Sequence, residues 1–559
     1  MNKSQNEIVK KVNKIVVSYI NKENVKNRKY LINSLHILLN GNYDKYNLEL
    51  ESTFNYDSNE KLQKILYTIN EKTDDRKLNG VYYTPEDVCV YIILNSIIMN
   101  LEKDNSRTYK EKDALEHILK HNSEEIDTLL YKNTFIDPTC GSGEFLINLF
   151  RIKLKLLELY EGNYSDENIY KIVKTIYGND ILEDSTDIAK IRLFFEVIQH
   201  VKNVSYYEKI SKILKQQFSN QDYVLYNEKN NNKYNFVIGN PPYVEYGNLS
   251  YKKVLQNNYG NIYADVIKNS IKTIKNNGVV GFVVPLSYIS TSRMDPIRSY
   301  VREKTDRQFI LSFADRPDCL FQGVHQKLNI LIVRKSKSEH KLFTSNYKHW
   351  YKEERVNLLN GCEIKENHHI DGTFIPKIGN NIEENIFRKI YTVTEENLFT
   401  KQCIEGKSIY LNMRACFWIK AFSFNPGSNE YKELKFSDKD YWLVSCILNS
   451  SLFWVYWTIM SDCWHITSKE LKGFYFPQID ENTNNHCKLL FRKLEQKLEK
   501  TKKYIGSKQS DYEYKHKECK SEIDKIDDYL AQIYQLTDEE LSYVKNFALR
   551  YRTGGDTHE

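Results

Sequence analysis

Two consecutive prolines follow the end of a predicted strand near the middle of the chain, where residues 235–243 read NFVIGNPPY. Proline fixes φ and removes a backbone donor, so the turn keeps a rigid set of acceptors, namely the Asn240 side-chain oxygen and nearby carbonyls. Tyr243 adds an aromatic face. Such an array suits a planar amino group that donates two N–H bonds beneath a ring. An ordinary proline turn is the plainer interpretation, and the position at a strand end of an α/β sheet argues against it.

A glycine-rich turn lies earlier in the chain, where residues 135–145 read FIDPTCGSGEF. Its glycines permit positive φ and let a ligand approach the backbone, and the following helix offers free N–H groups at its start. The segment is not a Walker A loop, because no Gly-Lys-Ser/Thr follows, and it is not a GxGxxG fingerprint. Alone, a turn of this kind does not specify a cofactor.

An acidic residue ends the next predicted strand, where residues 178–181 read GNDI. A carboxylate at this position, Asp180, can accept hydrogen bonds from a ribose diol, although Asp is also a favoured helix N-cap. The interval from Asp137 exceeds the ~20 residues of the compact dinucleotide pattern. A long helix over 144–174 would account for the difference.

Elements that position these residues follow from the pattern of apolar runs. Short β-rich runs alternate with amphipathic helices, which predicts a mostly parallel α/β sheet. The run at 279–284 is apolar on both faces, as a central strand should be. The six predicted strands are Thr134–Ile136, Thr175–Tyr177, Phe236–Ile238, Val279–Val284, Phe309–Phe313 and Asn329–Val333.

Four segments organise the rest of the chain. Residues 1–79 have helical spacing of apolar residues and predict an N-terminal helical segment. The α/β unit covers 80–337 and ends at a predicted linker, KSKSEHKL, at 335–342. Residues 338–480 are aromatic-rich and predict a second α+β unit, and 481–559 are helical and charged. The helical spacing near the N-terminus is carried by Ile8, Val12, Ile15, Val16 and Tyr19.

Composition and charge exclude several classes of protein. The 559 residues are 41% hydrophobic, with 21 glycines and 10 prolines, which excludes a disordered or fibrous chain. The net charge of +6 is mild, and residues 488–520 alone carry 11 Lys/Arg and 5 Asp/Glu. The 10 cysteines form no CxxC pair or zinc spacing. We find no predicted signal peptide or membrane span and expect a cytoplasmic protein.

The order of the motifs identifies a resemblance. The chain contains five motifs in a fixed order: GVYYTP at 80–85, DPTCGSGEF, GNDI, QDYVL at 221–225 and NPPY. Together they resemble the gamma group of S-adenosylmethionine-dependent N6-adenine DNA methyltransferases of restriction–modification systems. The similarity covers roughly 80–335. It extends more loosely to LNSSLF at 448–453 and IYQLTDEE at 533–540. The resemblance implies a Rossmann-like class I methyltransferase domain followed by a target-recognition domain.

The resemblance also implies roles for individual residues. Asn240 and the Pro241 carbonyl would hold the target amino group, Pro242 would stiffen the turn, and Tyr243 would stack on the target base. Phe321 is a loosely matched candidate for a second stacking ring, and a place in the core is an equally good interpretation. The residues implied for S-adenosyl-L-methionine are Tyr82, Thr84, Pro85, Asp137, Pro138, Cys140, Gly141, Gly143, Asp180, Ile181, Asp222 and Tyr223.

The implied reaction is direct transfer of a methyl group to a flipped adenine of double-stranded DNA. The N6 atom cannot reach the cofactor inside a duplex, so the base must leave the stack. Two acceptors would favour a pyramidal nitrogen, and no metal or covalent nucleophile is implied. Residues 338–480 would read the sequence, with these polar candidates: Arg355, Lys377, Arg414, Lys420, His465, Thr467, Ser468 and Lys469.

Alternative functions remain open at this point. NPPY also serves methyltransferases that act on RNA bases or on protein glutamine. A fused restriction enzyme would need a metal-binding carboxylate cluster, and Glu363-Ile364-Lys365 has the spacing without a well-placed upstream Asp. A DNA-binding subunit with a degenerate catalytic domain is a further alternative, against which the intact motifs argue. A cognate restriction endonuclease is a possible partner, and the sequence decides neither this nor the oligomeric state.

Overall fold

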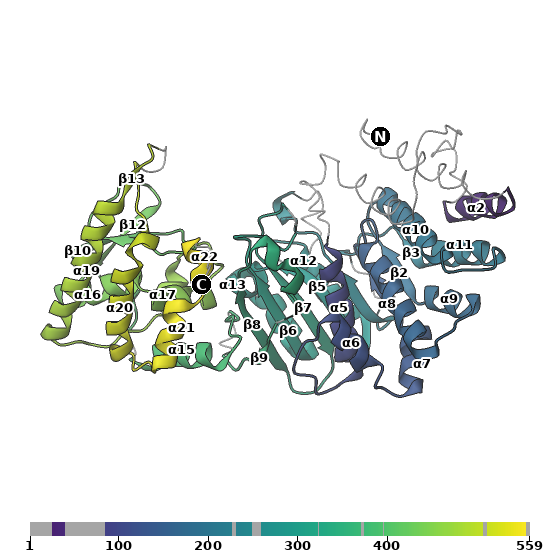
Figure 1. The fold of residues 1–559 in the computed structure, drawn as a ribbon, viewed down its shortest axis with the longest axis horizontal. Helices are drawn as coiled ribbons and strands as arrows, with labels where there is room; N and C mark the ends of the chain where they lie inside the picture. Colours follow the sequence, from purple (N-terminus) through teal and green to yellow (C-terminus); the bar gives the residue numbers. More distant parts are fainter. Residues whose placement is uncertain are drawn as a thin grey trace.

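The computed structural model describes residues 25–39, 84–225, 231–248, 259–321, 323–360, 362–369, 374–394, 396–506 and 511–554. Figure 1 shows two lobes, a first lobe built on a large sheet and a C-terminal lobe made mainly of helices. Tyr82 and the predicted helical residues at 8–19 lie outside the described residues.

The first lobe contains a sheet of nine strands in the order β3-β2-β1-β4-β5-β7-β6-β8-β9. The pairs from β3 to β5 are parallel, and β7 runs antiparallel to both of its neighbours. All six predicted runs are strands of this sheet, so the predicted α/β class is confirmed. The strands are β1 (Phe135–Asp137), β2 (Ile176–Asn179), β3 (Phe218–Ser219), β4 (Tyr234–Gly239), β5 (Ile274–Pro285), β6 (Thr305–Phe313), β7 (Leu328–Lys335), β8 (Lys341–Lys348) and β9 (Lys365–Glu366).

Helices pack against this sheet and fill the connections between its strands. Two of them, α5 and α8, lie against each other, and α10 contacts α8. The helices are α2 (Val25–Leu38), α5 (Glu86–Leu101), α6 (Glu111–Ile118), α7 (Ser123–Tyr131), α8 (Glu144–Glu161), α9 (Asp166–Val173), α10 (Glu183–Ile198), α11 (Ser205–Gln217), α12 (Tyr263–Thr273), α13 (Ser287–Ser290) and α14 (Asp295–Lys304).

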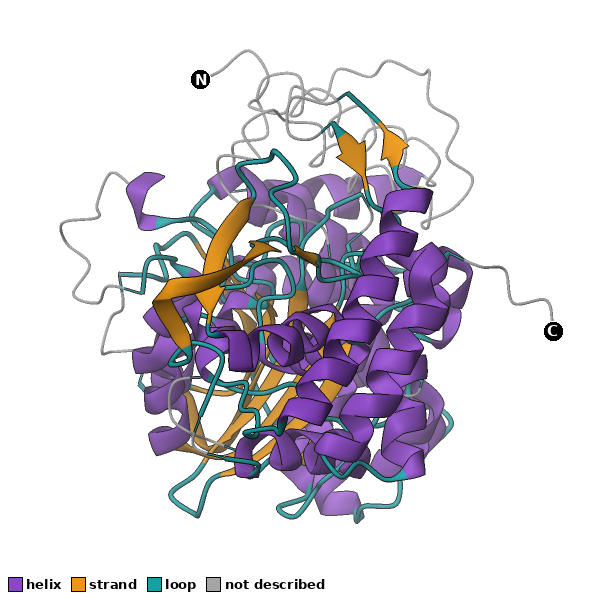
Figure 2. Cartoon of the chain, turned by 90° about the vertical axis from the view of Figure 1, so that its left-hand side faces the viewer, coloured by secondary structure: helices purple, strands orange, loops and turns teal. Residues whose placement is uncertain are grey.

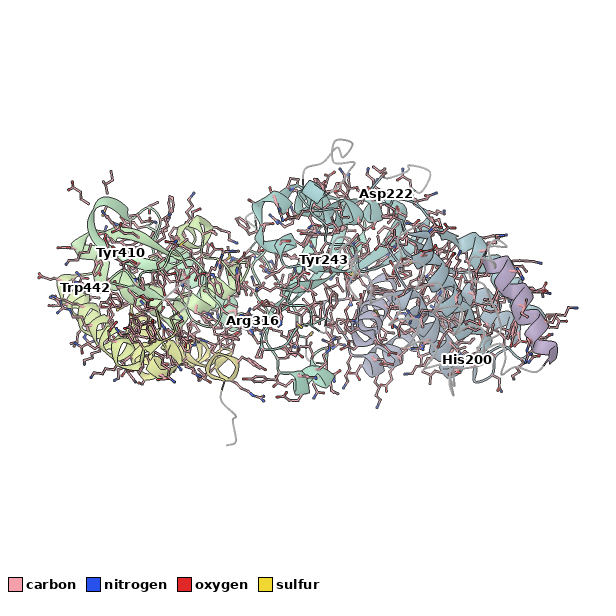
Figure 3. All side chains as sticks on the ribbon, turned by 90° about the horizontal axis from the view of Figure 1, so that it is seen from above. His200, Asp222, Tyr243, Arg316, Tyr410 and Trp442 are labelled. Atoms are coloured by element: carbon pink, nitrogen blue, oxygen red, sulfur yellow. The ribbon has the colours of Figure 1, made fainter. Side chains whose placement is uncertain are left out.

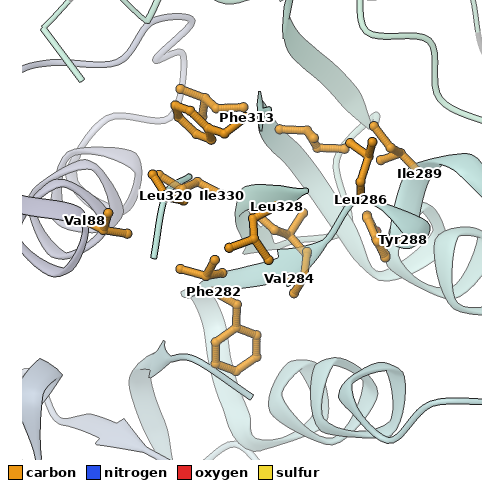
Figure 4. Packing of buried hydrophobic residues seen from close by; sticks show 14 of the residues in the cluster. Val88, Phe282, Val284, Leu286, Tyr288, Ile289, Phe313, Leu320, Leu328 and Ile330 are labelled. Carbon is orange, nitrogen blue, oxygen red and sulfur yellow. The ribbon is translucent and has the colours of Figure 1, made fainter. Parts of the chain in front are cut away.

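The core of the first lobe lies along β5 and β7. Phe282 and Val284 of β5 and Leu328 and Ile330 of β7 are completely buried, and Val88 of α5 belongs to the same cluster (Figure 4). Each side chain of this size contributes about 1.5–3 kcal/mol when it leaves water. A strand whose side chains are apolar on both faces is therefore most stable in the centre of the sheet, as predicted for 279–284.

The sheet continues beyond the predicted boundary at residue 337. β8 pairs in parallel with β6, and β9 pairs with β8. The segment 335–342, predicted as a linker between domains, instead joins β7 to β8 within one sheet. The segment is polar because it is a short exposed connection between two strands, and its composition is the same as that of a linker between domains.

The C-terminal lobe packs helices around a three-stranded sheet, β11-β10-β12 (Figure 2). The helices that follow residue 481 pack on the helices before it, α19 on α16 and α20 on α17. The elements are α15 (Asn381–Thr392), β10 (Gln402–Asn412), β11 (Ala421–Phe422), β12 (Tyr431–Phe436), α16 (Asp438–Asn449), α17 (Ser451–Met460), α18 (Ser468–Lys472), α19 (Glu481–Thr501), β13 (Lys503–Tyr504), β14 (Tyr512–Glu513), α20 (Lys520–Ile533), α21 (Asp538–Asn546) and α22 (Leu549–Thr553).

Helices α16 and α17 form a bent, largely buried pair in this lobe. Among the described residues, no single helix is long and apolar enough to cross a bilayer, and only α16 and α17 together meet that measure, with a bend of 68° between them. All ten residues of α17 are buried, including Trp454, Tyr456 and Trp457. Their apolar character is therefore used in the core of the lobe.

Candidate active site

The glycine-rich turn connects β1 to α8 and is held in a left-handed conformation. Gly141 has φ of +51° and Gly143 has φ of +86°, which L side chains rarely adopt. A Cβ at Gly143 would also lie 3.0 Å from the Cβ of Ala189 in α10. Gly143 precedes the first residue of α8, so the turn brings the helix N-terminus to the end of β1. Both glycines are therefore required by the shape of the turn.

Asp180 follows β2 and holds the turn through its carboxylate. The Gly141 backbone N–H donates to Asp180 Oδ2 at 2.9 Å, and the Leu182 N–H donates to Oδ1 at 3.0 Å. Burial raises the pKa of Asp180, although these backbone hydrogen bonds oppose the rise. The next side chain, Ile181, is 60% exposed. The Ile181 N–H also interacts with this carboxylate, which has about four lone-pair sites in all and so can take a further donor.

Asp137 joins the glycine turn to the proline corner. Its side chain is 2% exposed and accepts the Thr139 N–H at 3.1 Å. Burial raises the pKa of Asp137 well above its usual range, and the charge of Asp180 raises it further. A Cβ at Gly239 would lie 2.5 Å from Asp137 Oδ1, so a side chain there would force Asp137 to move. Pro138, next along the turn, accepts a hydrogen bond from Asn179 through its carbonyl, and Cys140 is buried.

The proline corner follows β4 directly and lies beside the glycine turn. The Thr139 hydroxyl donates to the Asn240 carbonyl at 3.4 Å. The Tyr243 hydroxyl lies 2.6 Å from Asn240 Oδ1, to which it donates, and 3.1 Å from the Val283 carbonyl. In Figure 3, Tyr243 lies in the middle of the molecule, toward the junction with the C-terminal lobe. Pro241 is buried and Pro242 is half-buried.

Asp222 and Tyr223 lie in the turn that follows β3. Asp222 accepts the Val224 N–H at 2.9 Å and so closes its own turn. The Tyr223 hydroxyl donates to Thr273 at the end of α12 at 3.1 Å. A hydrogen bond of 2.9 Å from the Asn179 amide to the Gln221 carbonyl ties this turn to β2. The structure thus brings this segment to the edge of the sheet where Asp180 lies.

Thr84 and Pro85 directly precede α5, with Pro85 at its N-cap position. Thr84 is buried, and its carbonyl accepts a 3.7 Å hydrogen bond from Cys89. The next residue, Glu86, reaches Arg151 of α8 at 3.4 Å. The N-terminal end of α5 therefore lies against the helix that the glycine turn begins.

Phe321 is placed in the core. It is 1% exposed and belongs to the main hydrophobic cluster, so its ring does not face an open surface. The stacking role implied for Phe321 has no support in this geometry, and the interpretation as a core residue accounts for its environment. The loose match of the sequence around Phe321 does not distinguish a stacking ring from a core residue.

The polar candidates for sequence reading are largely engaged within the protein. Arg355 forms two hydrogen bonds to Asp87 at 2.7 and 2.8 Å. Lys377 is 1% exposed and donates to the Ser461 carbonyl at 2.7 Å. The others are held as follows: Arg414 by Glu430, His465 by Asp462, Thr467 as the N-cap of α18 and Lys469 by the Met460 and Ser290 carbonyls, while Lys420 is half-buried with a pKa lowered by burial and Ser468 is exposed.

Metal-binding residues are not assembled in the described part of the chain. Among those residues, no group of three His, Cys, Asp or Glu is arranged to hold a metal ion. In the Glu363-Ile364-Lys365 segment, Lys365 pairs with Glu384 at 2.9 Å.

Part of the first lobe is similar to known restriction-modification proteins. Residues 174–319, which include the GNDI and NPPY segments, match the family model described as Eco57I restriction-modification methylase. A putative type II restriction enzyme and methyltransferase from Methanocaldococcus jannaschii is 28% identical over 165 residues. That match covers 25% of this chain and only 14% of the relative's length.

A solved structure, that of MmeI, shares the fold at low sequence identity. The Type IIL restriction-modification enzyme MmeI, in complex with DNA, superposes with a TM-score of 0.54 at 12% identity, over 99% of this chain and 96% of that chain. A nuclease-deletion mutant of the Type ISP enzyme LlaGI has a TM-score of 0.46 at 13% identity, over 88% of this chain and 62% of that chain. Over residues 174–319 this chain is therefore similar to Eco57I restriction-modification methylases, and the chain as a whole shares the fold of MmeI.

Proposed function

We propose that this chain is a site-specific adenine N6-methyltransferase that transfers a methyl group from S-adenosyl-L-methionine to an everted adenine of double-stranded DNA. One observation carries the proposal. The acceptor corner at Asn240 adjoins the glycine turn, since Gly239 lies against Asp137 and the Thr139 hydroxyl donates to the Asn240 carbonyl. A bound cofactor and a target amino group would therefore be neighbours.

The residues of the glycine turn fit a nucleoside cofactor. Nothing lies within 4 Å of the position that a Cβ would take at Gly141, so the backbone is open there, beside the N-terminus of α8. The Asp180 carboxylate accepts from the backbone of Gly141, Leu182 and Ile181 and has capacity for a further donor such as a ribose hydroxyl. Asp222 and Tyr223 would flank the adenine of the cofactor, and Thr84 and Pro85 its methionine end. The bound cofactor would supply a sulfonium methyl group that is already activated for transfer.

The corner at 240–243 prepares an acceptor for the target nitrogen. Asn240 Oδ1 already accepts a hydrogen bond, and its donor is the Tyr243 hydroxyl. An adenine amino group that enters the site would replace this hydroxyl and would donate its second N–H to the Pro241 carbonyl. Two such acceptors turn the nitrogen lone pair out of the base plane, toward the glycine turn. The proton released on transfer passes to Asn240 or to water.

The target base must leave the duplex to reach this corner. Unstacking costs a few kcal/mol, and the ring of Tyr243 would return about 1–3 kcal/mol by stacking. A second stacking ring is left unassigned, since Phe321 is in the core. The C-terminal lobe would supply sequence selectivity, and the MmeI structure, solved with DNA, supports DNA as the substrate.

A parallel labelling experiment tests the substrate class. The full chain is incubated with methyl-labelled S-adenosylmethionine and, separately, with duplex DNA, RNA and protein. We expect the label in duplex DNA alone. Label in RNA or in protein glutamine would replace DNA as the substrate, and cofactor binding with no transfer would indicate a binding subunit with an inactive domain.

A further inference from the structure

A buried arginine outside the predicted site reaches into the glycine turn. Arg192 lies in α10 with its side chain 4% exposed. Its guanidinium donates to the Ser142 carbonyl at 2.8 Å and to Glu144 Oε2 at 2.9 Å. One side chain thus holds both the residue before Gly143 and the first residue of α8.

The turn is restrained at each of its residues by the elements around it. Asp180 holds the Gly141 N–H, Arg192 holds the Ser142 carbonyl, and Ala189 fills the space beside Gly143. Two of these three restraints come from a single helix, α10, one turn apart. Helix α10 therefore restrains the glycine turn at Ser142 and Gly143, which fixes the backbone that a nucleoside would approach.

A planar guanidinium is needed for this task. Arginine presents donors in a fixed fork and can bond a carbonyl and a carboxylate at the same time, whereas a lysine ammonium is a point charge on a flexible stem. Glu144 lies in the first turn of α8, where a negative charge is favourable, and it balances the charge of Arg192. We infer that Arg192 is a positioning residue that sets the shape of the glycine turn and through it the affinity for the cofactor. This inference rests on the proposed function.

A matched control lies between the same two helices. Arg151 of α8 forms two hydrogen bonds to Glu196 of α10, at 2.7 and 3.1 Å. The Arg151–Glu196 pair joins α8 to α10, as the Arg192–Glu144 pair does. Arg151 also bonds to Glu86, and both of its glutamate partners lie outside the glycine turn. Loss of Arg151 therefore reports on the packing of α8 against α10 and α5, while the hydrogen bonds to the glycine turn itself stay in place.

The test measures the Kd of S-adenosylmethionine by calorimetry and the melting temperature for the full chain and three variants. Arg192→Met should raise the Kd about tenfold or more, since the turn loses two hydrogen bonds that fix its shape. Arg192→Lys should raise it by a smaller factor and retain most of the melting temperature. Arg151→Met should lower the melting temperature and leave the Kd within about twofold of the wild-type value.

Each outcome decides the inference. An unchanged Kd in both Arg192 variants, or equal changes in Arg192→Met and Arg151→Met, overturns the positioning role. If Arg192→Met does not fold, the comparison of Arg192→Lys with Arg151→Met decides. A wild-type chain that binds no cofactor overturns the proposed function and this inference with it, whereas wild-type binding that Arg192 variants do not alter overturns the inference alone.

Discussion

The two lobes use their polar side chains in opposite ways. In the first lobe, strands β1, β2 and β4 end at one edge of the sheet and bring Asp137, Asp180 and Asn240 together there. In the C-terminal lobe, polar groups that the sequence suggests for DNA reading, such as Lys377, serve the protein's own carbonyls and carboxylates. A parallel sheet collects residues at its carboxyl edge. A helical lobe has no such edge at which functional side chains collect, so a charged residue there often stabilises the fold instead.

Removal of the acceptor at Asn240 should give the largest effect on the first lobe. Asn240→Ala deletes the side-chain oxygen that would orient the target nitrogen, and we expect methyl transfer to fall by about a thousandfold or more. Cofactor affinity, measured by calorimetry, should stay near the wild-type value. Equal losses of transfer and cofactor binding would make Asn240 a structural residue instead.

Asp180 should control cofactor affinity with a smaller effect. Asp180→Ala removes the acceptor for Gly141 and Leu182 and the proposed acceptor for the ribose, so the Kd of the cofactor should rise by about 10- to 100-fold. Asp166→Ala is the control, because Asp166 likewise accepts two backbone N–H bonds, from Lys202 and Asn203, away from the site. A similar rise in both variants would mean that the effect is one of stability.

Glu383 in the C-terminal lobe should add its own dependence of stability on pH to the contributions of Asp137 and Asp180, whose pKa values burial also raises. Glu383 of α15 is 1% exposed, and burial raises its pKa to about 7. The folded state then binds more protons than the unfolded state between about pH 4.5 and pH 7, so the free energy of unfolding falls as pH rises through this window, by at most roughly 3 kcal/mol.

Glu383→Gln removes the titrating group and should flatten that part of the profile. Denaturant unfolding at several pH values compares this variant with the wild type. Parallel profiles for the two proteins would show that Glu383 does not titrate in this range.

Arg355, which lies between β8 and β9 in the first lobe, offers the smallest effect and tests whether a polar candidate for DNA reading serves the fold instead. Arg355→Ala breaks the pair with Asp87, which is partly exposed, and should lower the free energy of unfolding by about 1 kcal/mol. The slope of DNA affinity against salt should not change, since only a side chain that neutralises a phosphate adds to that slope, by about 0.9 for each phosphate. Weaker DNA binding at unchanged stability would return Arg355 to the DNA interface.

Sequence patterns predicted the six strands and the segments that meet at the sheet edge, because short apolar runs and strand-end motifs depend on local chemistry. Arg192 gave no such signal. A charged residue in a helix is usually solvated, and its contact with Ser142 depends on how α10 packs. The place of Phe321 and the extension of the sheet to β8 likewise depend on contacts between distant segments, which composition does not encode.

The nucleosides of treated DNA test the central claim most directly. Duplex DNA of mixed sequence is incubated with S-adenosylmethionine and either the wild-type chain or Asn240→Ala, digested, and analysed by mass spectrometry. The account predicts 6-methyladenine from the wild-type protein and none above background from the variant. Methylcytosine in place of 6-methyladenine, or equal 6-methyladenine from both proteins, would contradict it.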